Sequence, residues 1–221
     1  RRREAPYYHE RALVVAIAGD RFWLLAGAFS GFLLVAPVVA TGLYAVSRAL
    51  ERGQRPSWRT VAVAWRPDNG RLVAFGLLLA LAGTGWVLTS AALVTGFAPA
   101  PVRNPMDFLR IVVLSERSWL FEAWLVLGAV LAAPVFASSV VAIPLLLDRR
   151  ESVLAAVYTS WRTVLAHPPA MALWAALILA LTLLCMATLL LGLIVVVPWL
   201  AHASWHAYRD LVDTTGLPEM P

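Results

Sequence analysis

Two histidines near the end of the chain have the residue type and spacing that most clearly suggest chemistry. His202 and His206 are four residues apart, so in a helix they lie on one face. That spacing allows both imidazoles to chelate a metal ion, or one of them to ligate a haem iron. The pair lacks the glutamate of a His-Glu-x-x-His metalloprotease helix, and its alternative role is hydrogen bonding to headgroups, water or neighbouring helices. We expect no catalytic residue and no resident cofactor, with metal or haem here as an alternative.

Other reactive groups are scarce. The lone cysteine, Cys185, lies in an apolar run, so neither an intrachain disulfide nor a cysteine-based metal cluster can form. The sequence has no Gly-rich phosphate loop, nucleotide signature or catalytic triad. The interiors of the apolar runs carry no acidic residue, which counts against a proton-coupled pump. The charges at 148–151 predict a simple cluster at a helix end.

Long apolar helices must hold these residues. The 46 residues from 163 to 208 include no Asp, Glu, Lys or Arg. One helix of that length would rise roughly 69 Å, about twice the ~30 Å hydrocarbon core of a bilayer, so the run must cross twice. Three shorter charge-free runs cross once each. The expected spans are about 22–47, 72–97, 120–147, 169–188 and 190–208.

The sequence therefore predicts an all-α, polytopic transmembrane bundle over residues 22–208. Residues 1–21 form a basic segment with a short apolar stub, which we interpret as a lost or shortened helix or an interfacial helix, and residues 209–221 form a tail. Hydrophobic residues make up 61% of the chain and charged residues 14%, which is not a soluble profile. The net charge of +5 lies in loops, where it fits contact with anionic lipid headgroups. A nucleic-acid site would need a basic face in water, and none is available, so we expect no nucleic-acid partner.

Internal repetition is the second strong signal. Ser-Trp-Arg-Thr-Val occurs at 57–61 and again at 160–164, each time between two apolar runs. A Gly-x5-Pro pattern begins at Gly31, Gly128 and Gly192. Together they predict a duplicated unit, made of a Pro-bearing helix, a basic loop with an amphipathic helix, and a returning helix. The pattern also puts the last hairpin turn near 189–191.

The distribution of arginine predicts the orientation. Loops 48–71 and 148–168 and the tail after 208 carry ten Arg, against three in the opposite loop, 99–118. Positive residues favour the cytoplasm, so the Ser-Trp-Arg-Thr-Val loops and the C-terminus are expected there. Five Arg in the N-terminal segment oppose this, and a missing upstream helix would remove the conflict. Because all 18 basic residues are Arg, as in GC-rich bacterial genomes, we expect a bacterial inner (cytoplasmic) membrane protein.

The loops themselves are expected to be helical. Residues 57–66, with Ser57 as the N-cap, and residues 151–166 space their apolar side chains for interfacial helices. A third short helix is expected from Pro105 to Leu114. The side chains predicted to form a lipid or partner interface are Trp58, Arg59, Trp65, Trp161 and Arg162.

Four prolines lie inside the expected spans: Pro37, Pro134, Pro144 and Pro198. Proline removes a backbone donor and kinks a helix. Such kinks mostly shape packing, and they can also make hinges or expose carbonyls to an ion.

Three blocks carry a family resemblance: Gly31 to Arg48, Pro144 to Arg149, and Ala201 to Leu211. Over residues 12–212 the chain resembles the uncharacterised bacterial integral-membrane family called domain of unknown function 2189, some members of which carry a cytochrome c oxidase subunit label. The resemblance implies a six-helix bundle, with most of the first helix missing from this chain, and no established activity. Four histidines cannot supply the six of a catalytic oxidase subunit.

The sequence thus predicts a non-catalytic membrane protein. We expect an accessory or assembly subunit of a larger respiratory or photosynthetic membrane complex, because the chain has little soluble domain of its own. One alternative is a small transporter or lipid-handling protein whose Pro-kinked repeats line a path. Another is a haem- or metal-binding protein using His202 and His206. The expected partners are the lipid bilayer with anionic headgroups and other proteins of the complex.

Overall fold

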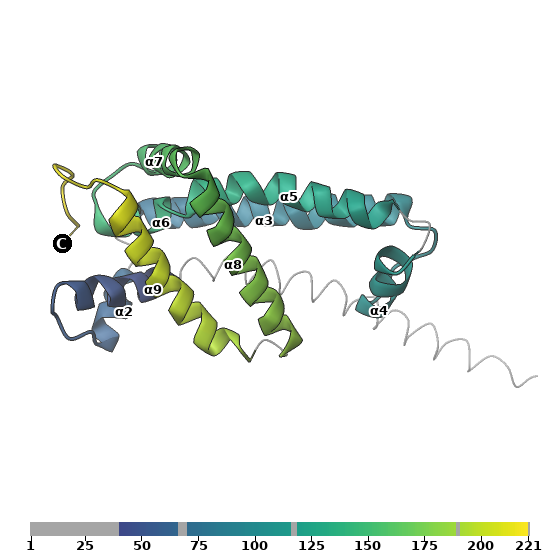
Figure 1. The fold of residues 1–221 in the computed structure, drawn as a ribbon, viewed down its shortest axis with the longest axis horizontal. Coiled ribbons are helices and arrows are strands. Elements are labelled where there is room, and N and C mark those ends of the chain that lie inside the picture. The colour runs from purple at the N-terminus through teal and green to yellow at the C-terminus, as the bar shows by residue number, and fades with distance from the viewer. Residues whose placement is uncertain (1–39, 66–69, 116–118, 189–190, 221) are drawn as a thin grey trace, which may run out of the picture. The chain divides into compact units, whose positions relative to one another are not determined.

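A computed structural model describes residues 40–65, 70–115, 119–188 and 191–220 (Figure 1). Every helix or strand assigned within these ranges is a helix, which confirms the all-α prediction; a single isolated bridge pairs Arg149 with Glu219. The elements are helical residues 40–51, α2 (Trp58–Ala64), α3 (Gly70–Phe97), α4 (Pro105–Asp107), the π-helical turn η1 (Phe108–Val113), α5 (Leu120–Ser139), α6 (Ala142–Asp148), α7 (Val153–Ala166), α8 (Pro168–Ala187) and α9 (Leu193–Leu211).

Within the described residues, three helical segments are long and apolar enough to cross a membrane. They are Gly70–Phe97, Leu120–Asp148 and Pro168–Cys185, close to three of the five expected spans. The helix α9 covers the region of the expected span 190–208, and its crossing stays a prediction. Most of the expected span 22–47, with Pro37 and the apolar stub of the N-terminal segment, lies outside the described residues.

The second of these segments is interrupted between α5 and α6. Pro144, the third residue of α6, has no N–H to donate to the carbonyl of residue 140, and its ring crowds that carbonyl. Residues 140 and 141 accordingly leave the helix, and the Val141 N–H donates to the Ser160 hydroxyl instead (3.1 Å). Pro134 and Pro198, by contrast, lie inside the continuous helices α5 and α9. Of these three prolines, only Pro144 lies beside a break in the helix, and there the Ser160 hydroxyl accepts the backbone donor that the break frees.

The chain divides into two compact units. The first takes its described residues from 80–131, and its core joins Val94, Val112 and Leu120. Aromatic rings surround this core, and the Trp124 indole donates to the Ser90 hydroxyl (2.7 Å). The short helix expected at 105–114 is present as α4 and η1, and its interfacial location stays a prediction.

The second unit takes its described residues from 40–79 and 132–220. Its core centres on α6, and it draws on helical residues 40–51, α7 and α9. The buried side chains of this core are Tyr44, Phe75, Val141, Ala142, Leu145, Leu146, Leu147, Ala156, Ala201, Trp205 and Tyr208. The helices α8 and α9 are neighbours, and the chain reverses between them (Figure 1).

The two Ser-Trp-Arg-Thr-Val copies take different places in their helices. Ser57 is the exposed N-cap of α2, and its backbone N–H donates to the Thr60 hydroxyl (3.1 Å). Ser160 is buried in the middle of α7, which begins instead after Ser152, whose hydroxyl accepts from the Ala155 N–H (3.1 Å). The predicted helices at 57–66 and 151–166 are thus present, while the duplication of a whole unit stays a prediction.

Candidate functional site

The two histidines meet on one face of α9. Their Nε2 atoms are 3.3 Å apart, and their rings are nearly perpendicular, with centroids 4.6 Å apart. Both residues are exposed. On its other side, His202 Nδ1 lies 2.8 Å from the hydroxyl oxygen of Ser47, a residue far away in the sequence. The structure therefore adds a third polar side chain to the predicted pair.

Helical residues 40–51 supply that side chain because one of their faces lies against α9. One turn beyond Ser47, the Glu51 carboxylate accepts a hydrogen bond from the buried Trp205 indole (2.7 Å) and pairs with Arg209 (2.9 Å). Ser47 and Glu51 are four residues apart, so they lie one helical turn apart on the face that contacts α9. The two helices are thus held together by polar contacts over two turns.

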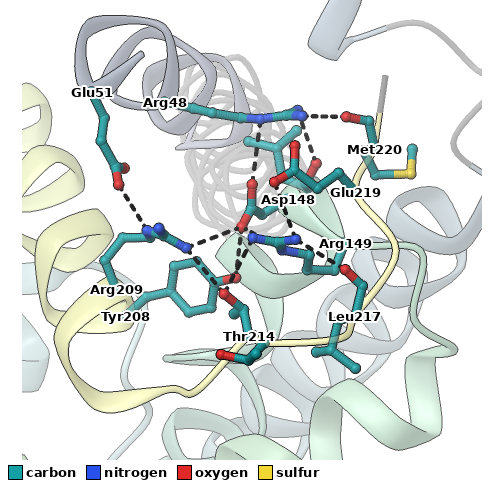
Figure 2. A network of polar contacts seen from close by, with 12 residues as sticks. Arg48, Glu51, Asp148, Arg149, Tyr208, Arg209, Thr214, Leu217, Glu219 and Met220 are labelled. Carbon is teal, nitrogen blue, oxygen red and sulfur yellow. Dashed lines mark hydrogen bonds and ion pairs between the residues drawn. The ribbon is translucent and has the colours of Figure 1, made fainter.

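A buried carboxylate lies at the end of α6, where these helices meet (Figure 2). The Asp148 side chain is only 4% exposed and lies close to four guanidinium groups. Its partners, with their distances, are Arg149 (3.1 Å), Arg48 (3.4 Å), Arg209 (3.7 Å), Arg52 (4.0 Å) and the Tyr208 hydroxyl (2.9 Å). Because a lone buried carboxylate would be costly, this surrounding charge is what makes the position tolerable.

The residues after α9 fold back onto this cluster, as Figure 2 shows. The Asp148 carbonyl accepts from the Met220 N–H (2.9 Å), and Arg149 donates to the Leu217 carbonyl (3.0 Å) and to Thr214 (3.2 Å). Glu219 pairs with Arg52 (2.8 Å) and Arg149 (3.3 Å). The segment 212–220 is therefore fixed along the end of the second unit by both backbone and side-chain contacts.

The charges of the cluster affect one another. Burial lowers the pKa of the Arg48 guanidinium, and the charge of Arg52 adds to this shift, while Asp148 and Glu219 oppose it. A guanidinium still stays protonated in a protein, so the effect appears as a free-energy cost that the carboxylates must offset. The polar groups of the cluster contact one another, which is typical of a cluster that stabilises the fold.

The predicted interface residues do not form one group. On α2, Trp58 is 90% exposed and Arg59 is exposed as well, while Trp65, the C-cap residue after this helix, is 48% exposed. On α7 the Trp161 indole donates to the Ser138 hydroxyl (2.9 Å), and the Arg162 guanidinium lies over the Tyr158 ring. Trp161 is thus partly committed to packing within the unit, whereas the Trp58 ring is free for contact with lipid or a partner.

Comparison with known protein families gives a match within the first two thirds of the chain. The model of a family described as "Predicted integral membrane protein (DUF2189)" matches residues 24–148, more than half of the 221 residues. The chain belongs to this family. No curated protein and no solved structure matches it.

The DUF2189 match ends at Asp148, so it includes Ser47 and two partners of the buried carboxylate, Arg48 and Arg52, but not α9. It thus identifies the chain as an integral membrane protein and assigns no role to His202 or His206. Among the described residues no group of three or more His, Cys, Asp and Glu could hold a metal ion.

Sequence reasoning missed the central position of Asp148 in this DUF2189 chain. It predicted a local helix-end cluster, whereas Arg48 and Arg209 come from segments far away in the sequence. The available signal was the equal offset of Arg48 and Arg209 from their Gly-x5-Pro patterns, each at the end of its helix. Nothing in that signal indicated a shared acidic partner.

Proposed function

We propose that this membrane protein is a non-catalytic accessory or assembly subunit of a larger membrane complex, with respiratory or photosynthetic complexes as the leading candidates. The observation that carries the proposal is the unburied aromatic and basic face of α2, where no residue is buried. Trp58, exposed over 90% of its surface, stands beside the exposed Arg59. Tryptophan and arginine are enriched among the side chains that dominate protein interfaces.

The helix α8 supports the same role. Residues Pro168–Cys185 are strongly apolar, yet only 11% of them are buried. Exposed leucines cover it: Leu173, Leu177, Leu179, Leu183 and Leu184. In a bilayer, this surface is available to lipid chains or to helices of a partner.

The polar cluster bears on how many times the chain crosses the membrane. Asp148 contacts Arg48 and Arg209, so all three belong on one side. Between Asp148 and Arg209 the chain runs through α8 and α9, so if α8 crosses, α9 must return across as well. This argument supports the five-span prediction, with 190–208 as the last span. The proposal also includes an orientation: the Ser-Trp-Arg-Thr-Val loops and the C-terminus lie on the cytoplasmic side of a bacterial inner membrane.

The test is a native gel of the tagged chain, extracted from its own membranes in mild detergent, followed by mass spectrometry of the band. We expect a large band containing subunits of a respiratory or photosynthetic complex. Trp58→Ala should abolish this co-purification, whereas Trp199→Ala, which removes another exposed tryptophan (63%) on α9, should not.

A band of the chain alone, or of a small homo-oligomer, would contradict the proposal and put transport or lipid handling first. Equal co-purification by the Trp58→Ala and wild-type chains would retain the complex but reject α2 as the docking element.

A further inference from the structure

The distance between the two imidazoles suits a shared ion. A tetrahedral ion that binds each nitrogen at 2.0–2.1 Å would hold its two ligand atoms about 3.3–3.4 Å apart. The Nε2 atoms of His202 and His206 are 3.3 Å apart, a separation slightly longer than usual for a hydrogen bond with an N–H donor. Since the ring centroids are 4.6 Å apart, the rings approach one another at their Nε2 edges.

Ser47 lies where it can hold His202 in the tautomer that a metal ligand requires. When its hydroxyl donates its single hydrogen to the Leu43 carbonyl (3.1 Å), its oxygen is left to accept from His202 Nδ1, 2.8 Å away. In this arrangement the proton of a neutral His202 lies on Nδ1, and Nε2, the nitrogen 3.3 Å from His206 Nε2, keeps its lone pair. Metal-ligating histidines almost always have such a hydrogen bond on the second nitrogen.

The geometry also disfavours a single haem held by both imidazoles. Two axial imidazoles of one haem lie on opposite faces of the iron, with nitrogens about 4 Å apart at ordinary metal–nitrogen distances, which the side-by-side arrangement of this pair does not provide. Imidazole suits zinc, copper, nickel and cobalt rather than magnesium or calcium. Because no third His, Cys, Asp or Glu joins the pair among the described residues, the remaining coordination positions would be open to water.

We propose that His202 and His206, with Ser47 as a positioning residue, bind one divalent first-row transition ion at the end of α9. This site goes beyond the proposed subunit role and does not depend on it. Both histidines lie in the last three turns of α9, near the ion pair of Arg209 with Glu51, at the end that we expect to reach the membrane surface, where an ion has access without unfolding of the helix.

Titration of the full chain with cobalt tests the site. The chain would be purified in mild detergent, stripped with a chelator and titrated with Co²⁺, whose visible absorption reports its coordination. We expect one Co²⁺ per chain, with displacement by Zn²⁺. His202→Ala and His206→Ala should each abolish the signal, whereas His167→Ala, which removes the exposed histidine after α7, should leave it unchanged.

Ser47 has a readout of its own. Ser47→Ala should weaken Co²⁺ binding about 10- to 100-fold, as for other partners of ligating histidines, and Ser47→Thr should restore it. Absence of a stoichiometric signal in the wild-type chain would overturn the site whatever the variants do. Equal loss in His167→Ala would also overturn it, because the bound ion would then depend on a histidine outside the proposed site. The native gel tests the subunit role separately, so the two proposals can fail independently.

Discussion

Asp148 is the central residue of the polar cluster in the second unit. Its side chain is 4% exposed, and its carboxylate contacts four guanidinium groups and a phenol. Removing one member of a buried ion cluster leaves the others uncompensated, at a cost of about 3–5 kcal/mol. We therefore expect Asp148→Asn to lower the free energy of unfolding by about 3 kcal/mol.

Thermal unfolding in detergent, followed by tryptophan fluorescence, would measure this loss. The matched control is Asp210→Asn, which removes an exposed carboxylate at the end of α9. The control should unfold like the wild type. Equal melting of both variants would show that the Asp148 cluster contributes little net stability.

The repeated pentapeptide offers a second comparison at the residue scale. Ser160 accepts the Val141 N–H freed at the α5–α6 interruption, and it is fully buried. Because Ser160→Ala would leave that donor unpaired, we expect a loss of about 1–3 kcal/mol. Ser57→Ala, at the equivalent position of the other copy, should cost less because Ser57 is exposed. Chemical denaturation would rank the two, and equal losses would contradict the structural difference between the copies.

At the scale of elements, a glycine fixes how α2 packs. A Cβ atom at Gly42 would lie 2.9 Å from both the Trp65 indole nitrogen and Val61 Cγ1, closer than real Cβ contacts come. We expect Gly42→Ala to displace α2 and to speed limited proteolysis in the exposed loop at 52–57. Gly76→Ala is the matched control, because no atom lies within 4 Å of the Cβ it would add. That control should leave the cleavage pattern unchanged and add helix propensity.

The limits of sequence reasoning are clearest in these elements. Long charge-free runs predicted α3, α5 and α8 within a few residues, because hydrophobic length is a local property. The same reasoning merged α5 and α6, since three of the prolines look alike in sequence and only Pro144 stands beside a break. What distinguishes it is the Ser160 hydroxyl, a tertiary partner. The contact of Ser47 with His202 was likewise beyond local pattern.

At the scale of the whole molecule, the polar cluster and the arginine count independently indicate that the loop 48–71 and the C-terminal tail lie on the same side of the membrane. The count predicts that the loop 48–71 and the tail are cytoplasmic, and the ion pair between Arg52 and Glu219 (2.8 Å) requires these segments to share a side. The count cannot tell a crossing of α9 from a hairpin that enters and leaves on the same face. Labelling of the turn between α8 and α9 separates these arrangements.

Single cysteines introduced into a Cys185→Ala chain decide the topology. With a membrane-impermeant maleimide on intact bacterial cells, we expect labelling of Ala100→Cys, in the loop 99–118, and of Leu191→Cys, an exposed residue beside the last turn. Gln54→Cys and Thr215→Cys should react only after the cells are opened, because both positions lie on the arginine-rich side. If Leu191→Cys were protected while Ala100→Cys reacted, α8 and α9 would form a re-entrant hairpin. Labelling of Gln54→Cys in intact cells would invert the orientation, and a metal site on α9 would then face the outside.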